Sequence, residues 1–326
     1  MQFDGKKVLV AGGTGMIGIP LVRLLVERGA QVRISSLDSP ERAHPDAEFL
    51  RLDLTDMANC RAACAGMDFV FNLLGVKASP ALTRTKPGRF LYNTVMMEFS
   101  MLEAARLEGV AGYQLTSSVG VYAPAEVFAE DDVWSTFPSP NDWYSGWSKR
   151  VGELQVEAYR IEYGMEDLTI TRPANVYGPF DNFDSENAMV VPSLIKRALT
   201  SDGTLSVWGD GSAIRDFIFA EDVAAGMLRV AEAAPDKPVN LGSGHGYSIR
   251  ELVTAIAANM DNPPEIHWDT TKPTGDARRI LDMDRARSLG FTPATSLTEG
   301  VRRTMEWYAA NRDATSLRYD VYGDGK

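Results

Sequence analysis

The chain has few of the residues that mark disulfide-bonded, metal-binding or membrane-spanning proteins. Its 326 residues include two cysteines, Cys60 and Cys64, and three histidines scattered along the chain. Two cysteines one helical turn apart are typical of a reduced helix, and they predict no metal site. No apolar run reaches about 18 residues, so we expect no membrane partner. The first strand pattern starts at Val8, which leaves no room for a signal peptide and favours a cytoplasmic protein.

Positive charge is also scarce. The chain has 33 Lys and Arg against 44 Asp and Glu, for a formal net charge of −11. This balance excludes a general nucleic-acid-binding surface, and we expect no nucleic-acid partner. It is compatible with a small anionic ligand, because such a ligand needs only a few local arginines.

The clearest motif is a glycine-rich turn between a strand pattern and a helix pattern. The apolar run Val8–Ala11 ends at the first of three glycines, and leucines at helical spacing follow the third. In such a turn the first glycine permits the sharp bend, the second leaves room for a pyrophosphate, and the third lets the helix pack close to the sheet. Free N–H groups at the helix start favour phosphate. The turn residues predicted to bind a dinucleotide are Gly12, Gly15, Met16, Ile17 and Gly18.

Strand and helix patterns alternate through the first half of the chain. The expected strands are Val8–Ala11, Gln31–Ser35, Glu48–Leu52, Asp68–Leu74, Tyr113–Ser117 and Leu168–Arg172. The expected helices end near Arg28 or span Met57–Cys64, Thr94–Glu108 and Ser145–Tyr163. This rhythm predicts an α/β fold, a Rossmann-type doubly wound parallel sheet with a smaller C-terminal substrate lobe.

The rhythm breaks near residue 174, where prolines, glycines and short elements dominate. Two later stretches, Leu205–Trp208 and Val239–Leu241, are predicted to return to the sheet. We therefore expect a dinucleotide-binding domain over 1–173 with returning segments near 205–242. Segments 174–204 and 243–326 would form the substrate-binding lobe, over the carboxyl ends of the strands.

Several segments together resemble the extended short-chain dehydrogenases/reductases, the family of nucleotide-sugar epimerases, dehydratases and reductases. The matching segments are the glycine turn, Asp53–Asp56, Asn72–Gly75, Thr116–Tyr122 and Arg172–Pro179. The resemblance covers nearly the whole chain, and within the family it is nearest to GDP-fucose synthase-like reductases. It implies that Asp53, Leu54 and Leu74 lie beside the adenosine of the cofactor. It also implies that Ser118, four residues before Tyr122, is the catalytic hydroxyl.

The second half resembles the family's site for a nucleotide-diphosphate sugar. The similar segments are Asn175–Phe183, Val191–Ile195, Val207–Gly211, Arg215–Ile218 and Ala277–Asp282. The resemblance implies substrate contacts by Asn175, Val191, Arg215 and Arg278. Guanidinium groups grip phosphate oxygens in pairs, although a surface ion pair is the plain alternative for either arginine alone.

The expected proton-transfer residue is missing or displaced. The family places a tyrosine four residues before a lysine, but four residues before Lys149 is Ser145, and Tyr144 lies five before. A spacing of five turns a side chain by about 100° on a helix. Three alternatives follow. Tyr144 reaches the site from an irregular helix start; Ser145 replaces it with the help of a water; or the substrate or another residue supplies the proton.

Two other positions depart from the fucose synthases. Their Cys and His positions hold Gly120 and Met189 here, and neither residue moves a proton, so we expect no 3,5-epimerisation. The cofactor stays open between NAD and NADP. Asp38 would bond the ribose of NAD, whereas Ser36 tolerates a 2′-phosphate. Arg33 or Arg42 would pair with that phosphate.

The sequence thus favours an NAD(P)-dependent enzyme that transfers a hydride at a sugar carbon of a nucleotide-diphosphate sugar. Ser118 would orient the reacting oxygen, and Lys149 would hold the nicotinamide ribose. The alternative is a non-catalytic dinucleotide-binding sensor or partner module. The helix Thr94–Glu108 carries apolar side chains around more of its circumference than one buried stripe requires. With the family's common four-helix interface, this predicts a homodimer through that helix and Ser145–Tyr163.

Overall fold

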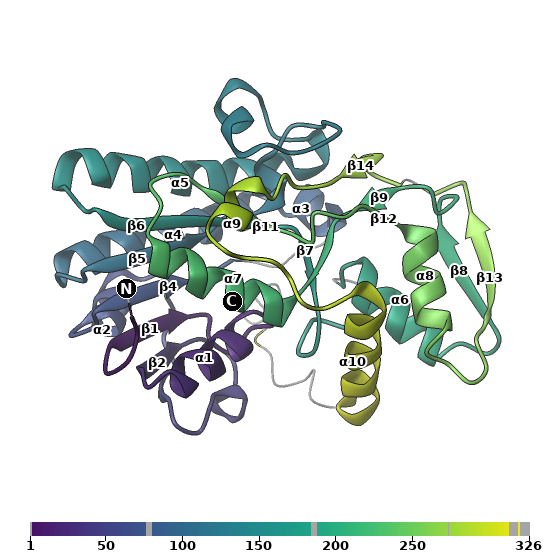
Figure 1. The fold of residues 1–326 in the computed structure, drawn as a ribbon, viewed down its shortest axis with the longest axis horizontal. Helices are drawn as coiled ribbons and strands as arrows, with labels where there is room; N and C mark the ends of the chain where they lie inside the picture. Colours follow the sequence, from purple (N-terminus) through teal and green to yellow (C-terminus); the bar gives the residue numbers. More distant parts are fainter. Residues whose placement is uncertain (1, 76–79, 184–187, 273, 313–318, 320–326) are drawn as a thin grey trace.

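A seven-stranded parallel sheet forms the centre of the molecule (Figure 1). The computed structural model describes residues 2–75, 80–183, 188–272, 274–312 and Tyr319. The strand order is β11-β6-β5-β4-β1-β2-β3. The strands are β1 (Lys7–Ala11), β2 (Gln31–Ser35), β3 (Glu48–Leu50), β4 (Phe69–Asn72), β5 (Gly112–Thr116), β6 (Asp167–Pro173) and β11 (Val239–Leu241). The predicted fold class is confirmed.

The strand order creates a gap between neighbouring loops at one edge of the sheet. From β1 the chain runs outward to β2 and β3, then crosses back so that β4 pairs with the other side of β1. The loops that leave β1 and β4 therefore diverge in opposite directions. In doubly wound sheets, the crevice between two such loops is where ligands bind.

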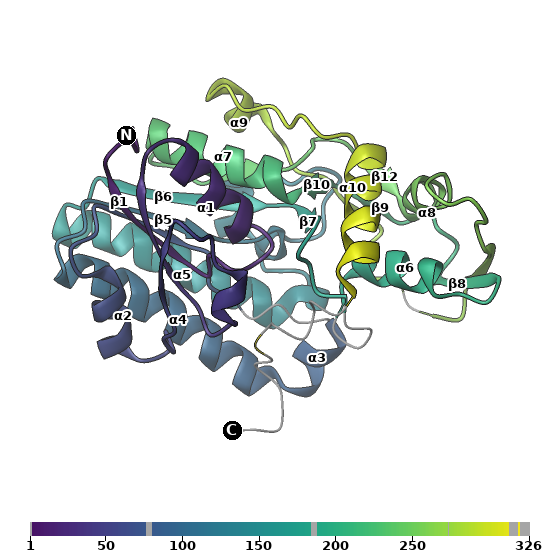
Figure 2. The same cartoon turned by 90° about the horizontal axis from the view of Figure 1, so that it is seen from below.

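Helices cover both faces of the sheet (Figure 2). On one face lie α1 (Gly18–Glu27) and α7 (Ala220–Ala233), and on the other lie α2 (Met57–Cys64), α4 (Pro87–Leu107) and α5 (Trp143–Tyr163). Strand β1 shows how the two cores divide. Val8 and Val10 join the core beneath α1, whereas Leu9 and Ala11 join the core beneath α4, because successive side chains point to opposite faces.

The smaller lobe has a hydrophobic core of its own. Its helices are α6 (Val190–Leu199), α8 (Ile249–Ala257) and α10 (Leu297–Ala310), and its two-stranded sheet joins β8 (Thr204–Trp208) to β13 (Glu265–Asp269). Short strands connect the lobe to the sheet: β7 (Asn175–Tyr177) with β10 (Phe217–Phe219), and β9 (Ile214–Arg215) with β12 (Tyr247–Ser248) and β14 (Arg278–Arg279). The remaining elements are η1 (Pro40–Arg42), α3 (Pro80–Thr85), η2 (Val119–Val121), η3 (Glu130–Ser135), η4 (Pro140–Asp142) and α9 (Asp284–Ser288).

One of the two predicted returns to the sheet is wrong. Val239–Leu241 does join the central sheet, as β11 beside β6. Leu205–Trp208 instead pairs in parallel with Glu265–Asp269 in the smaller lobe. Its apolar side chains pack against α6 and α8, so the alternating pattern identified a strand but did not specify its partner. The division of the chain into two domains stays a prediction.

Both cysteines are buried and free, and burial raises the pKa of each thiol to about 12. They are therefore unreactive packing residues of α2. Within the part of the chain that the structure describes, no helix is long and apolar enough to cross a bilayer.

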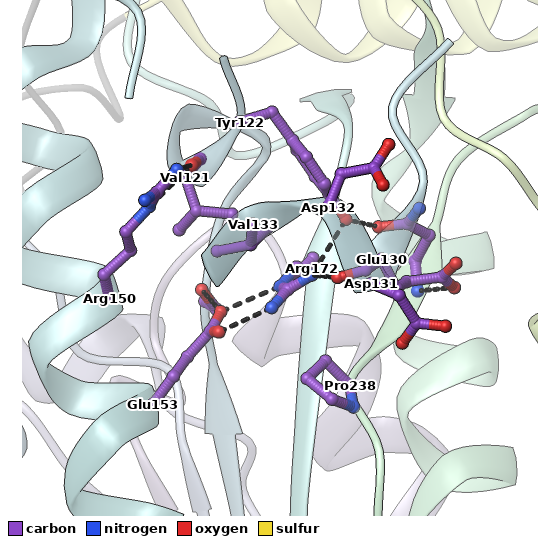
Figure 3. Close-up of polar contacts among 12 residues, drawn as sticks. Val121, Tyr122, Glu130, Asp131, Asp132, Val133, Arg150, Glu153, Arg172 and Pro238 are labelled. Atoms are coloured by element: carbon purple, nitrogen blue, oxygen red, sulfur yellow. Dashed lines mark hydrogen bonds and ion pairs between the residues drawn. The ribbon is translucent and has the colours of Figure 1, made fainter. Parts of the chain in front are cut away.

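A buried ion pair fixes α5 against the sheet (Figure 3). Arg172 of β6 donates from Nη2 to Glu153 Oε2 of α5 at 2.6 Å and from Nε to Oε1 at 2.9 Å, and both side chains are at most 1% exposed. Arg172 also donates to the Tyr122 hydroxyl and the Glu130 carbonyl. Ser117, just after β5, donates to Glu153 at 2.5 Å. One helix and two strand ends are thereby held together.

We predict that replacing Arg172 alone is more damaging than replacing both partners. Arg172→Leu leaves the Glu153 carboxylate buried without a cation, which should lower the free energy of unfolding by about 3–5 kcal/mol. The double variant Arg172→Leu with Glu153→Leu leaves no isolated charge and should lose less. Urea unfolding followed by fluorescence measures both. A single variant that unfolds at the same urea concentration as the unsubstituted protein would contradict this expectation.

Candidate functional site

A cavity of about 320 Å³ opens at the carboxyl edge of the sheet. Its walls come from the loops after β1, β4, β5 and β6, the start of α5, and the start of α6 in the smaller lobe. Predicted site residues that line it are Met16, Ile17, Leu74, Ser118, Ser145, Lys149, Asn175 and Val191. Those that lie outside its lining are Gly12, Gly15, Gly18, Ser36, Asp38, Asp53, Leu54, Tyr144, Arg215 and Arg278.

The glycine turn has the backbone geometry that the motif predicts. Gly12 has φ +82°, a conformation that side chains other than glycine rarely adopt. A Cβ on Gly18 would collide with the Gly12 carbonyl oxygen and lie 2.6 Å from the Gly13 Cα, so α1 packs directly on the turn. Met16 and Ile17, between the turn and α1, reach the cavity. The contact of Gly15 with a pyrophosphate stays a prediction.

The residues expected to select the cofactor are tied to the glycine turn. The Thr14 hydroxyl donates to Asp38 Oδ2 at 2.8 Å and accepts from the Ser36 hydroxyl at 2.7 Å. Arg42 donates to the Thr14 carbonyl, and its Nε lies 3.7 Å from the Asp38 carboxylate. Arg33 instead pairs with Glu48 and donates to backbone carbonyls at the end of α2. Arg42, rather than Arg33, is therefore the cation at this corner.

The two residues from the segment after β3 lie apart from the cavity. Asp53 accepts bonds from the backbone and hydroxyl of Thr55, so its carboxylate shapes the turn before α2. The Leu54 side chain is buried in the core beneath α4. Contacts of Asp53 and Leu54 with a cofactor stay predictions.

Two serine hydroxyls frame the floor of the cavity. Ser118 Oγ accepts a bond from the Gly120 N–H at 3.0 Å, and Ser145 Oγ donates to the Asp142 carbonyl at 3.0 Å. A Cβ placed on Gly120 would lie 3.4 Å from the first hydroxyl and 3.5 Å from the second. The space left by the missing side chain of Gly120 therefore lies between the two hydroxyls.

Tyr144 lies outside the cavity lining. Helix α5 begins at Trp143 and is regular from there, so a residue five before Lys149 is turned away from the cavity, and Tyr144 is 37% exposed. The alternative in which Tyr144 reaches the site from an irregular helix start finds no support in this geometry. Ser145 occupies the position where the family has its tyrosine, and the source of the proton remains Ser145, the substrate or another residue.

Lys149 is anchored by three acceptors. Its Nζ donates to the Thr116 carbonyl at 2.9 Å and to the Leu74 carbonyl at 3.2 Å, and it lies 2.5 Å from Glu98 Oε1. These acceptors come from the ends of β5 and β4 and from α4. The sequence identified Lys149 but not Glu98, because an acidic residue within an apolar helix pattern does not show which distant side chain it contacts.

The two arginines of β14 lie on opposite faces of the strand, and the substrate contact predicted for Arg278 stays a prediction. Arg278 points away from the cavity and pairs with Glu126 at 3.3 Å. Its neighbour Arg279 lines the cavity and pairs with Asp142 and Asp276, each at 2.5 Å. Strand alternation explains the difference, because Arg279 is the register partner of Arg215 and Arg278 faces the other way. Only the pairing of β14 with β9, which the sequence did not predict, identifies Arg279.

Arg215 and Arg279 stand beside the cavity with Asp142 and Asp276, so positive and negative charges balance at this corner. Burial, together with the neighbouring charge of Arg279, lowers the pKa of Arg215 to about 10. Arg215 donates to the Thr274 and Ile214 carbonyls, so its position is fixed.

The cavity lacks the side chains of a 3,5-epimerase at two positions. Gly120 and Met189 both line it, and neither titrates. Across the described residues, no group of three or more His, Cys, Asp or Glu side chains is placed to hold a metal ion.

Comparison with known proteins assigns the family. A model of the NAD dependent epimerase/dehydratase family matches residues 8–242. The chain belongs to this family. The resemblance to extended short-chain dehydrogenases/reductases is thereby confirmed, and the matched residues run from β1 to just past β11.

Curated relatives match over nearly the full chain. The GDP-L-fucose synthase of Sinorhizobium fredii is 30% identical, with 94% of this chain and 97% of the relative covered. GDP-mannose 3,5-epimerase 1 of Oryza sativa is also 30% identical, with 92% and 81% covered. The solved structure of a UDP-glucose 4-epimerase from Thermotoga maritima with UDP-glucose has a TM-score of 0.84 at 26% identity, over 94% of this chain and 100% of that one.

We predict that Lys149 contributes more than Tyr144 to dinucleotide binding and to turnover. Lys149→Met removes a charged donor at the cavity floor and should weaken dinucleotide binding by about 10- to 100-fold. Tyr144→Phe removes a hydroxyl outside the cavity and should leave both binding and turnover nearly unchanged. Fluorescence titration with NADH and NADPH, followed by turnover assays, compares the two. A loss of several orders of magnitude in kcat for Tyr144→Phe, with binding intact, would reverse the ranking.

Proposed function

We propose that this chain is an NAD(P)-dependent enzyme that acts on a nucleotide-diphosphate sugar by hydride transfer at a sugar carbon. The main support for this proposal is the cavity, whose lining includes the loop of the glycine turn, Ser118, Lys149 and residues of the smaller lobe. The relatives support the substrate class, because their names include GDP-L-fucose synthase and GDP-mannose 3,5-epimerase.

The residues present fit a dinucleotide. Thr94 and Thr116 line the cavity, and their hydroxyls are buried and have no hydrogen-bond partner among the residues that the structure describes. A ribose or a carboxamide would satisfy them, since buried polar groups are normally hydrogen-bonded. When bound, the nicotinamide supplies or accepts the hydride.

The chain's own groups position the reactants. Lys149 would hold the nicotinamide ribose through its ammonium group, and Ser118 would orient the reacting oxygen by a hydrogen bond. Ser145 stands beside them, but an aliphatic hydroxyl is a poor acid at neutral pH. It therefore passes a proton with a water, or the substrate or another residue supplies it. Gly120 and Met189 offer no proton for 3,5-epimerisation.

The smaller lobe would hold the nucleotide diphosphate. Arg215 and Arg279 are proposed to bind its phosphate oxygens, because they lie on one face of β9 and β14. Asn175 and Val191 line the cavity and are proposed to contact the substrate. At the cofactor corner, Asp38 would bond the ribose of NAD, whereas Arg42 would pair with the 2′-phosphate of NADP. Titration with both dinucleotides distinguishes them.

A non-catalytic dinucleotide-binding module is the second candidate. The specific observation in its favour is that Ser145 holds the tyrosine position while Tyr144 is turned away from the cavity. Mass spectrometry of ligands released on denaturation tests both candidates. A co-purified nucleotide sugar supports the enzyme, whereas a dinucleotide alone, with no turnover of any nucleotide sugar, supports the module.

We predict that Gly15→Val removes dinucleotide binding. The new side chain would begin 3.2 Å from the Gly12 carbonyl and occupy the space meant for the pyrophosphate. Gly88→Val is the matched control, because a Cβ at Gly88 meets no atom within 4 Å. Calorimetric titration measures affinity, and thermal unfolding confirms that both variants are folded. Undiminished affinity in folded Gly15→Val protein would show that the pyrophosphate lies elsewhere.

We also propose that the chain forms a homodimer through α4 and α5. These packed helices expose large apolar side chains, with Tyr92 62%, Leu154 51% and Ile161 79% exposed. Large apolar side chains exposed along a pair of packed helices are a feature that a subunit interface would bury.

We predict that Ile161→Asp converts the dimer to a monomer, because the new carboxylate would be buried between two copies. Val127→Asp, on a loop away from α4, is the control and should remain dimeric. Light scattering at micromolar concentration measures both. A monomeric unsubstituted chain would contradict the proposal.

A further inference from the structure

A buried acid lies directly behind the cavity lysine. Glu98 projects from the middle of α4 and is 1% exposed. Its Oε1 lies 2.5 Å from Lys149 Nζ, and apart from that contact neither carboxylate oxygen has a hydrogen-bond partner among the described residues. An unpaired carboxylate at this depth is strongly disfavoured, so Lys149 provides the compensating charge.

The contact also completes the surroundings of the lysine. An ammonium group has three N–H donors and no acceptor. Thr116 and Leu74 offer a carbonyl each, and Glu98 offers the third acceptor. The first two are neutral, so Glu98 alone supplies opposite charge within this set. The position of Nζ is therefore determined from three directions.

The contact between Glu98 and Lys149 is notable because the family's tyrosine, four residues before the lysine, is missing here. A tyrosine four residues before Lys149 would bring a phenol next to the ammonium, but Ser145 stands there. The lysine charge faces an acid on a neighbouring helix instead. We propose that Glu98 is a positioning residue, which fixes the ammonium group of Lys149 at the cavity floor. This inference rests on the proposed dinucleotide site.

The packing between α4 and α5 leaves room for the acid. A Cβ on Gly152 of α5 would collide with Glu98 Oε2, so the glycine gives the carboxylate its space. Burial raises the pKa of Glu98, while Lys149 opposes this shift by its charge and its hydrogen bond. The pair therefore depends on both partners.

The other titratable groups nearby already have partners. On α5, Glu153 is held by Arg172, and on β5 the Tyr113 hydroxyl accepts a bond from Asn72. On the lobe side of the cavity, Asp142 is paired with Arg279. Within the described chain, Lys149 is the cation paired with Glu98.

Removal of the acid should make cofactor binding sensitive to pH. In Glu98→Gln protein the ammonium of Lys149, whose side chain is 12% exposed, has lost its counter-ion, and a cation in such a place gives up its proton at lower pH. Dinucleotide affinity of this variant should therefore fall about tenfold more than that of the unsubstituted protein between about pH 6 and pH 9. Glu98→Asp keeps the charge and should restore most of the original profile.

The experiment is a fluorescence titration with NADH and NADPH across that pH range, with thermal unfolding at each pH. Glu103→Gln is the matched control, because Glu103 lies on the same helix, outside the cavity lining, and pairs with Arg106. If Glu98→Gln does not fold, Gly152→Ala displaces the carboxylate without removing it and should give the same pH sensitivity. Parallel profiles for the variants and the unsubstituted protein would overturn the inference alone. No dinucleotide binding by the unsubstituted protein would overturn the proposed function as well.

Discussion

The buried pair of Arg172 and Glu153 is the constraint on which the site depends. It joins β6 to the middle of α5, and Glu153 lies one helical turn after Lys149 on that helix. Because a helix is rigid over one turn, fixing Glu153 also fixes the height at which Lys149 meets the sheet. Ser117 donates to the same carboxylate, so the neighbouring Ser118 is positioned by the same contact. One ion pair thus sets the positions of both side chains.

The fold was predictable where local pattern and global topology coincide. The glycine turn, the alternation of strands and helices, and the return of β11 all follow from periodicity and from the geometry of parallel sheets. Leu205–Trp208 failed because its partner strand, Glu265–Asp269, lies far along the chain, and an alternating pattern fits any sheet. The pattern specifies that a strand forms, and packing against α6 and α8 decides where.

The candidate site was likewise predictable where a local motif places the residue, and unpredictable where a tertiary contact does. Lys149, Ser118 and Met16 come from motifs with fixed spacing, and all three line the cavity, while their roles stay predictions. The place of Arg279 in the lining was missed because a one-residue shift in a strand reverses the side chain, and only the pairing with Arg215 sets that register. Glu98 was missed for a different reason. Its relation to Lys149 exists only in three dimensions, across the interface of α4 and α5.

The two ends of the cavity differ in how their charges are balanced. At the floor, Lys149 already has a buried counter-ion in Glu98, so its charge is compensated before any ligand arrives. At the lobe, Arg279 has Asp142 and Asp276, whereas Arg215 donates only to neutral carbonyls among its described hydrogen bonds and lies beside another guanidinium. Asp142 and Asp276 also attract Arg215, so the four side chains together carry no net charge. A diphosphate at the lobe would therefore be held by directed hydrogen bonds from the guanidinium groups rather than by net charge. A site of this kind would grip the phosphates at the lobe and leave the sugar to be oriented by Ser118 and Lys149.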